Sequence, residues 1–343
     1  MSNDHGVGEI SLRRARWSAP ETAFWLIAVA SIFLFSDRYL ILTEMAWLGL
    51  FALSLDLILG YAGIVSLGHA AFFGVGAYAA GLLAVHGIVK EPVLALLVAG
   101  LAATVLGFVT SFLVIRGSEL SQLMVTLGIA LLLRELANKF SNITGGFDGL
   151  QGIVIDPILG LFSFDIFGKV GFIYCLAVLF VLFLLARVIV NSPFGLSLRA
   201  IRNNPLRAAA IGIPVNRRLI AIYTLSAFYA GIAGALFTQT TALASLDVFS
   251  FERSADLLLV VVIGGAGYLY GGLIGAVVFR ILQDVFSSWT PQFWQFWIGL
   301  VLVLIVLLGR ERMHRGVLWL PRLVMRRFTD ARRGSAASGK AAP

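Results

Sequence analysis

The sequence predicts an all-α integral membrane protein of about ten transmembrane helices, with a broken or re-entrant late span. First, the 343 residues are 59% hydrophobic and 13% charged, with a mean hydropathy of +0.93, whereas soluble domains carry about 25% charged residues. Second, apolar runs recur along the chain, and most approach the roughly 20 residues that a spanning helix needs. Third, both ends are rich in arginine, which requires an even number of spans if both lie on one side.

The apolar runs set the expected order of the elements. Residues 1–20 form a polar tail with three arginines just ahead of the first apolar run. The tail and this run together resemble a signal peptide, but no small-residue cleavage site follows, so we expect an uncleaved first span. Residues 21–309 are the expected transmembrane domain, and residues 310–343 a basic tail that is partly disordered. The expected spans are residues 24–35, 40–59, 61–85, 93–115, 120–137, 170–190, 219–240, 255–265, 268–284 and 293–308.

The late apolar run, residues 255–284, is interrupted near its middle by six glycines. They are Gly264, Gly265, Gly267, Gly271, Gly272 and Gly275. We therefore predict two crossings, which brings the total to ten. The first, residues 255–265, is too short to cross hydrocarbon as a regular helix, so it should be a broken or re-entrant element inside the bundle.

The distribution of charge predicts the orientation. With both termini in the cytoplasm, 19 of the 26 Lys and Arg residues fall on that side, five fall outside and two lie within spans, as the positive-inside rule requires. The segments 138–169 and 243–253 are then expected outside. The net charge of +8 reports this orientation, so we expect no nucleic-acid partner.

The central segment, residues 191–218, has five arginines and no acid. Ser192 before Pro193 is typical of an N-cap followed by proline at the first helical position, and Asn204 before Pro205 repeats the pattern. We therefore expect two short helices between flanking spans. An ordinary basic loop is the alternative.

The second short helix should run from Pro205 to about Ile211. Gly212 can adopt the left-handed conformation that closes a helix, and Pro214 blocks its continuation. Because two turns are not stable alone, this helix needs a surface to pack against. Its small residues, Ala208 among them, would let that surface come close.

Glycine also dominates residues 60–81, GYAGIVSLGHAAFFGVGAYAAG. This density predicts either close packing between helices or backbone opened toward a polar pathway. His69 lies inside the membrane, where an ionisable group either faces a partner or cavity or is a neutral side chain bonded to a neighbouring helix. Our candidate pathway residues are Gly63, Ser66, Gly68, His69, Gly264, Gly265 and Gly267.

The other polar residues of the spans point to structural roles. Glu44 and Asp56 lie near enough to span ends to reach the interface, and Arg280 can pair with Asp284 one turn away. Cys175 lies in an apolar run as the single cysteine and is expected to be a small buried side chain. No second histidine stands at ligand spacing, so we expect no metal site.

Three stretches resemble the permease subunits of branched-chain amino-acid ABC importers, in particular the M-type subunit. The matching positions in the central segment are Phe194, Gly195, Leu198, Arg199, Ala200, Ile201, Arg202, Ala208, Ala209, Gly212 and Ile213. Further matches are Gly60 to Gly63, Ser66 to His69, Gly76 to Tyr78 and the glycine pattern from Gly264. The chain departs from the family at Pro205 and Ala209, where members often carry acids, so any salt bridge that those acids make is absent here.

The resemblance implies an importer permease in the bacterial inner membrane, multi-pass, with both termini cytoplasmic. Segment 191–218 would be the coupling loop that docks on the ATPase, through Arg199, Arg202, Pro205, Arg207, Ala208 and Gly212. The implied partners are a homologous H-type permease, two ATPase subunits and a periplasmic solute-binding protein, beside membrane lipid. Related permeases carry urea, amides or small organic acids, which leaves the substrate open.

The chain itself has no recognisable nucleotide site. Residues 334–341, GSAASGKA, nearly satisfy a phosphate-loop pattern, but alanine replaces the hydroxyl residue that holds magnesium and no strand precedes it. We therefore expect no cofactor and no enzymatic activity in this chain, with ATP bound by partner subunits. An ion-coupled secondary transporter is the alternative of another class, although it should show a coupling-ion site deep in the bundle. A membrane scaffold would lack a substrate path altogether.

Overall fold

A computed structural model describes residues 19–308, apart from residues 36 and 166. The predicted tails at residues 1–20 and 310–343 therefore lie almost wholly outside the described residues. The chain divides into two compact units, Met1–Arg280 and Ile281–Pro343, and each is described by itself.

A helix lies in each of the ten predicted apolar runs, so the all-α membrane fold is confirmed. The helices are α2 (Ala19–Leu34), α3 (Tyr39–Ala62), α4 (Ala70–Val85), α5 (Pro92–Val114), α6 (Glu119–Lys139), α8 (Lys169–Asn191), α11 (Val215–Thr241), α12 (Phe251–Gly264), α13 (Leu269–Trp289) and α14 (Trp294–Leu308). Within the described residues six of these are long and apolar enough to cross a membrane, namely α3, α5, α6, α8, α11 and α13. The total of ten spans stays a prediction.

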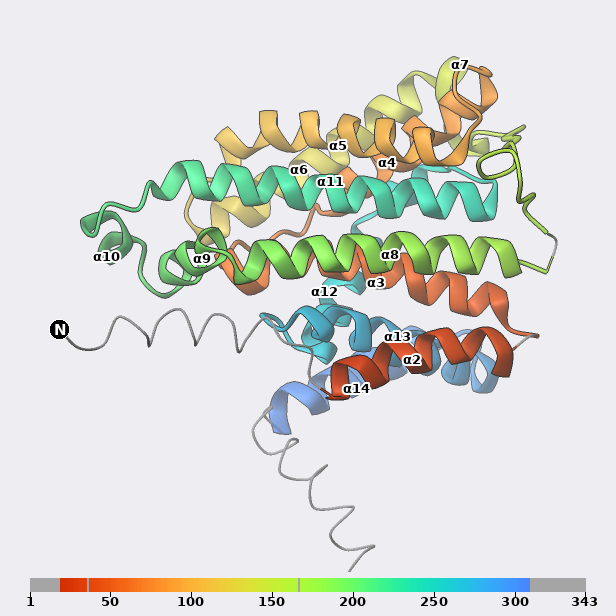
Figure 1. The fold of residues 1–343 in the computed structure, drawn as a ribbon. Coiled ribbons are helices and arrows are strands. Elements are labelled where there is room, and N and C mark those ends of the chain that lie inside the picture. Colours follow the sequence, from red (N-terminus) through yellow and green to blue (C-terminus); the bar gives the residue numbers. More distant parts are fainter. Residues whose placement is uncertain (1–18, 36, 166, 309–343) are drawn as a thin grey trace, which may run out of the picture. The chain divides into compact units, whose positions relative to one another are not determined.

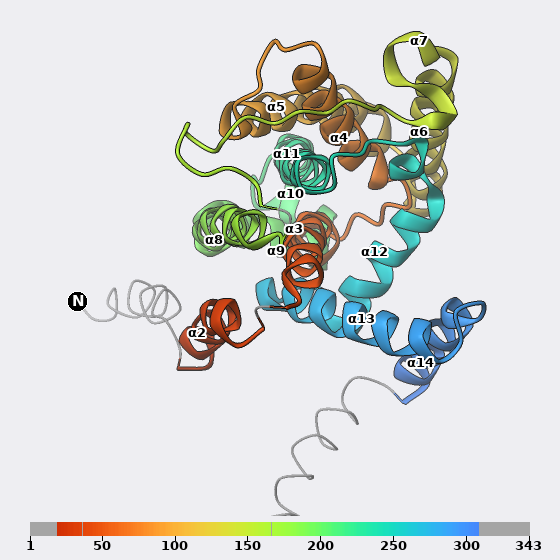
Figure 2. The same ribbon diagram turned by 90° about the vertical axis from the view of Figure 1, so that its right-hand side faces the viewer.

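The core of the first unit is built around α11. This helix packs along α5, α4 and α3, and α3 packs on α8. In Figure 1 these helices run lengthwise side by side, and Figure 2 looks along them, with α11 between α5 and α3. Small residues make this packing close, since a Cβ at Gly234 would lie 1.9 Å from the carbonyl oxygen of Phe73. The helices therefore meet through small residues, as is usual in membrane bundles.

The glycine-rich stretch does not form one continuous span over residues 61–85. Helix α3 continues to Ala62 and ends at Gly63, whose φ of +78° is left-handed. Residues 63–69 are not helical, and α4 begins only at Ala70. Gly68 lies against α6, where a Cβ would be 1.7 Å from the carbonyl oxygen of Thr126. A side chain at position 68 would prevent this close backbone contact.

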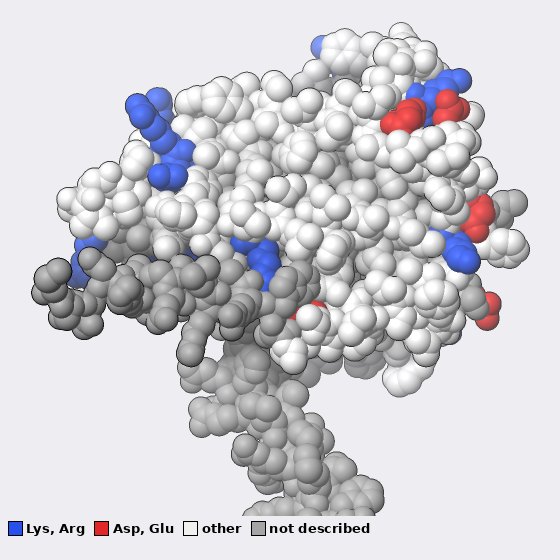
Figure 3. Space-filling view, viewed as in Figure 1, with Lys and Arg blue, Asp and Glu red and all other residues white. Residues whose placement is uncertain are grey.

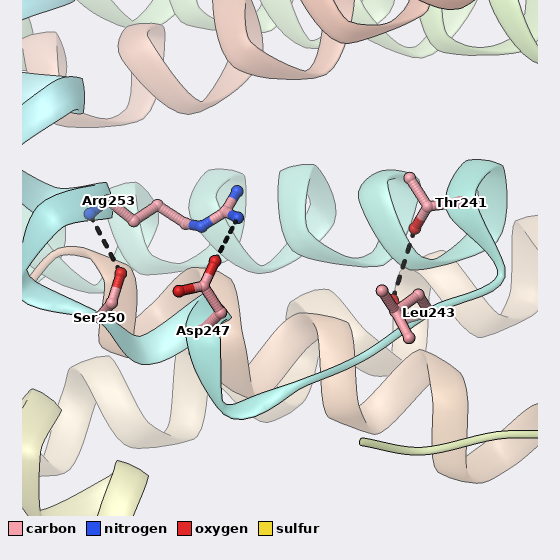
Figure 4. Close-up of polar contacts among 5 residues, drawn as sticks. All are labelled: Thr241, Leu243, Asp247, Ser250 and Arg253. Carbon is pink, nitrogen blue, oxygen red and sulfur yellow. Dashed lines mark hydrogen bonds and ion pairs between the residues drawn. The ribbon is translucent and has the colours of Figure 1, made fainter. Parts of the chain in front are cut away.

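The segment expected on the outside, residues 243–253, folds back along α11 (Figure 4), and its side of the membrane stays a prediction. Within it Ala244, Leu246, Val248 and Phe249 are buried, and the short 3-10 helix η2 (Leu246–Phe249) packs on α4 and α6. Its apolar side chains explain this fold, because burying them against the bundle removes them from water.

Arg253 and Ser250 start α12 inside this fold. The Ser250 hydroxyl accepts the backbone N–H of Arg253 (3.2 Å), and Arg253 Nη2 lies 3.4 Å from Asp247 Oδ2 (Figure 4). The guanidinium also stands over the Phe237 ring at 5.1 Å. Helix α12 has 14 residues, a length of about 21 Å, which is less than the roughly 30 Å of hydrocarbon. It is a short element held within the bundle, as the glycines predicted.

The second unit holds the C-terminal part of α13 and all of α14. The Phe286 ring stacks on the Trp297 ring with their centroids 6.2 Å apart. This contact joins the two helices by aromatic packing.

Candidate functional site

The central segment forms the two predicted helices, α9 (Pro193–Asn203) and α10 (Pro205–Ala210). They lie together at one end of the helix bundle (Figures 1 and 2). Asn204 caps α10, because its Oδ1 accepts the N–H of Arg207 at 3.0 Å. Gly212 has a φ of +86°, the left-handed conformation that the sequence predicted.

Ser192 occupies the N-cap position of α9 but does not cap it. Its backbone is extended, as expected for an N-cap, yet no side-chain bond to the first turn forms. Its hydroxyl donates to the carbonyl oxygen of Ile189 at 2.6 Å. The joint between α8 and α9 is made instead by Gly195, where a Cβ would lie 2.1 Å from the Val190 carbonyl oxygen.

Helix α9 faces inward. Leu198 and Ile201 are buried, and α9 packs on α3, α8 and α11. The Arg199 guanidinium lies over the Tyr61 ring, 5.3 Å from its centroid, a favourable cation–π distance. Helix α9 is therefore seated on the end of the bundle.

Helix α10 faces outward. Leu206 is 82% exposed and Ile211, just after the helix, is 75% exposed. Arg207 is also exposed, while Ala208 is buried on the inner side. Large apolar side chains this exposed, next to arginines, are typical of a surface that another protein covers.

Arg202 links α9 to residues from the predicted pathway. Its Nη1 donates a short hydrogen bond to the carbonyl oxygen of Gly60. A Cβ at Gly63 would lie 3.2 Å from Arg202 Cγ, and one at Gly267 would lie 3.1 Å from its Nη1. The structure thus brings Arg202, Gly63 and Gly267 together, although the sequence placed the first in one site and the other two in another.

Asp56 is fully buried, so the expectation that it reaches the interface is wrong. Helix α3 extends to Ala62, and Asp56 therefore lies well inside it. Its Oδ1 accepts the backbone N–H of Gly267 at 2.7 Å. Gly60 permits this approach, because a Cβ there would be 2.4 Å from the Gly267 nitrogen.

A polar cavity of about 460 Å³ opens beside this junction. Tyr61, Arg199 and Gly267 form one part of its wall. Arg187 and Glu21 form another, and Arg187 Nη1 lies 2.7 Å from Glu21 Oε2. This ion pair ties α2 to α8 and is a contact that the local sequence pattern did not predict.

His69 is fully buried between helices. Its Nε2 is 2.9 Å from the Ser54 hydroxyl and 3.4 Å from that of Ser226, and its ring stacks on Phe51 with centroids 5.7 Å apart. This is the arrangement of a histidine bonded to neighbouring helices, one of the two alternatives. Ser54 and Ser226 were not predicted; a hydroxyl residue within each apolar run was the available signal.

The other pathway candidates lie in closely packed backbone. Ser66 is fully buried, and a Cβ at Gly264 would lie 1.7 Å from the carbonyl oxygen of Gly271. These glycines let segments touch, and a role in the solute pathway stays a prediction. Outside this group, the ion pair shown for Arg280 is with Glu44 of α3.

Charge is unevenly distributed over the surface of the first unit. On the face shown in Figure 3, Lys and Arg occur at both ends, whereas acidic side chains gather chiefly at the end opposite α9 and α10. Most of the surface between the two ends is uncharged. This is the pattern expected of a chain embedded in hydrocarbon.

Comparison with known proteins agrees with these features. A family described as "Branched-chain amino acid transport system / permease component" matches residues 39–307. This chain belongs to that family. The match begins at α3, ends within α14 and includes α9, α10 and the break between α12 and α13.

Individual relatives support the same family. The high-affinity branched-chain amino acid transport system permease protein LivM of Salmonella typhimurium is 30% identical over 289 residues, which are 77% of this chain and 67% of that protein. LivM of Escherichia coli is 30% identical over 68% of this chain and 60% of its own length. A probable LivM of Methanocaldococcus jannaschii is 28% identical over 70% and 80%. No solved structure matches the chain.

Proposed function

We propose that this chain is a permease subunit of an ABC importer that moves branched-chain amino acids, or a related small solute, across the bacterial inner membrane. The ATPase subunits are separate chains that dock on the exposed residues of α10, which α9 holds on the end of the bundle. The observation that carries the proposal is the exposed apolar surface of Leu206 on α10 and of Ile211 just after it, at the end of the bundle. A six-residue helix is not stable alone, so a partner surface is expected to complete it.

The orientation follows from charge. The segment with α9 and α10 has five arginines and no acid, whereas acidic side chains gather chiefly at the opposite end (Figure 3). By the positive-inside rule the end with α9 and α10 would face the cytoplasm, where ATP is available. Both termini would lie on the same side. Segments 145–168 and the start of α8 would lie on the periplasmic side.

The partners and the substrate follow from family membership. The relatives are named as components of branched-chain amino acid transport systems, which favours leucine, isoleucine or valine over urea, amides or small organic acids. A homologous H-type permease would complete the pathway, two ATPase subunits would drive it, and a periplasmic protein would deliver the solute. Movement of α9 and α10 by the ATPase would rock the adjoining spans and switch the open side.

Reconstitution tests this proposal. The chain with its second permease, ATPase and binding protein should accumulate labelled leucine in proteoliposomes only when ATP is supplied on the side of α9 and α10. Liposomes that lack the ATPase subunits are the control and should take up none above background. Uptake that is independent of ATP and of the ATPase would contradict the proposal.

An ion-coupled transporter is the second candidate, because Asp56 is a carboxylate fully buried within a spanning helix. Such groups often bind coupling ions. The chain alone in liposomes, with a proton or sodium gradient imposed, tests this. Gradient-driven uptake that Asp56→Asn abolishes would favour the second candidate; we expect none.

A further inference from the structure

Three segments distant in sequence meet at the end of the bundle. They are the C-terminal turn of α3, the break between α12 and α13 at residues 265–268, and α9. Arg202 on α9 donates to the Gly60 carbonyl, and Asp56, one turn before Gly60, accepts the N–H of Gly267. We infer that Arg202 is a positioning residue that transmits movement of α9 to this break through the end of α3. The inference rests on the proposed function.

The first contact uses a carbonyl that the helix leaves open. Helix α3 ends at Ala62, so the Gly60 carbonyl is one of the last four and has no partner within the helix. A guanidinium suits this position, because the C-terminal end of a helix carries partial negative charge and bonds from charged donors are the stronger kind. Arg202 thus fixes α9 to the end of α3.

The second contact uses an N–H that the break leaves open. Gly267 precedes α13 and has a φ of +87°, and Gly265 has a φ of +97°. Both values lie where residues with a side chain are strained. Because Gly267 lies between α12 and α13, its N–H takes no part in the hydrogen bonds of either helix. Asp56 supplies its acceptor. Because Gly60 has no side chain, the two backbones touch directly.

The break is packed on one side and borders open space on the other. Gly267, Tyr268, Leu269 and Tyr270 line the cavity of about 460 Å³. A shift of α9 that pulls on Gly60 can move the break toward the cavity, because no close-packed atoms fill the space on that side. Arg199, which lies over the Tyr61 ring, makes a second contact between α9 and the same turn of α3.

This geometry separates two roles within the coupling segment. The exposed residues of α10 would receive the ATPase. Arg202, which the sequence placed among the docking residues, is bonded to Gly60 and would instead pass the movement on. Loss of Arg202 should therefore leave the ATPase bound and active but reduce the solute moved per ATP. A residue that only docks the ATPase would lose binding and transport together.

The experiment uses the full importer in proteoliposomes and compares Arg202→Met with Arg202→Lys. Methionine keeps an unbranched apolar stem but cannot donate, and lysine keeps a cationic donor. For Arg202→Met we expect solute moved per ATP to fall about tenfold, the equivalent of one hydrogen bond from a charged group, with ATPase retention and hydrolysis within about twofold of the parent. Arg202→Lys should restore at least half of the parent ratio. Both variants should melt within a few degrees of the parent.

A conformational readout tests the same link. An Ala266→Cys substitution places a thiol in the break, and the native Cys175 is fully buried and so should not react. The rate of maleimide labelling at position 266 should change on ATP binding in the importer that carries only Ala266→Cys. It should not change when Arg202→Met is added. Asp56→Asn keeps an oxygen to accept from Gly267 and should preserve this change, whereas Asp56→Leu should abolish it.

Distinct outcomes separate the two levels of the argument. If Arg202→Met moved as much solute per ATP as the parent importer, the inference would be overturned. Equal losses of ATPase binding and of transport in this variant would overturn it as well. Loss with Asp56→Asn equal to that with Asp56→Leu would also overturn it, because the carboxylate charge and not the hydrogen bond would then matter. Absence of ATP-driven uptake by the parent itself would instead contradict the proposed function.

Discussion

Helices α9 and α10 begin with the same sequence pattern, but α9 is buried against the bundle and α10 is exposed. Each starts with a polar N-cap residue followed by proline, and one residue separates them. Leu198 on α9 has no exposed surface, whereas Leu206 on α10 is 82% exposed. One helix is part of the bundle and the other rests on it.

This difference in burial shows how a short segment can bind a partner through one helix and pack on the bundle through the other. Helix α9 has eleven residues with a buried side, and arginines that reach Gly60 and Tyr61. Helix α10 has six, depends on its Asn204 cap, and presents apolar side chains to its surroundings. Substitutions should therefore affect stability in α9 and association in α10.

The largest expected effect is on association. The double substitution Leu206→Asp with Ile211→Asp replaces two exposed apolar side chains of the proposed docking surface by charges. Burying two such side chains is worth about 3–6 kcal/mol, so we expect ATPase co-purification to fall about a hundredfold or more.

The matched control changes two exposed leucines at the opposite end of the unit. Leu159→Asp with Leu161→Asp, at 69% and 77% exposure, should leave ATPase recovery unchanged. Equal losses in the two double variants would show that added charge, and not the position of α10, reduces association.

The stability of the permease should depend more on α9 than on α10. Leu198→Ala removes a fully buried side chain and should lower the free energy of unfolding by about 2–5 kcal/mol. Leu206→Ala, at an exposed site, should change it by no more than about 0.5 kcal/mol. Thermal melting of the purified permease in detergent measures both, and a similar cost for the two variants would show that α10 is not outward-facing.

The two glycines of the segment should differ in how their replacement acts. At Gly195 a Cβ would overlap the Val190 carbonyl, whereas at Gly212 it would meet nothing within 4 Å. Gly195→Ala should therefore shift α9 and cost about 1–3 kcal/mol. Gly212→Ala should cost about 1 kcal/mol, from the left-handed backbone alone, and melting curves should rank them in this order.

The smallest effects concern the caps. Asn204→Ala removes an observed bond to Arg207 and should cost about 1 kcal/mol. Ser192→Ala removes no cap bond and should cost only a few tenths of that. Hydrogen exchange over residues 205–210 should accelerate in the first variant and stay unchanged in the second. Faster exchange in both would show that Ser192 also supports α10.

Local signals predicted the helices well. The apolar runs located the ten hydrophobic helices, and Asn204, Pro205 and Gly212 located α10 to within one residue at its end. These features depend on neighbours a few residues apart, so they can be read from the chain. The short α12 followed from glycine, because its backbone freedom is also a local property.

The contacts that make the junction could not be predicted. The Arg202–Gly60 bond joins residues 142 positions apart, and the Asp56–Gly267 bond joins residues 211 apart. Asp56 was placed at the interface because the end of α3 was expected three residues too early. The inward fold of residues 242–250 was missed because its apolar residues are too few to show periodicity.

The most direct test of the account is the side of the membrane on which α10 lies. Arg207→Cys and Leu161→Cys should be treated with a membrane-impermeant maleimide, in intact cells and in inside-out vesicles stripped of peripheral ATPase. The fully buried Cys175 makes the parent chain the background control. We predict that position 207 labels only in inside-out vesicles and position 161 only in intact cells. Labelling of position 207 in intact cells would contradict the account.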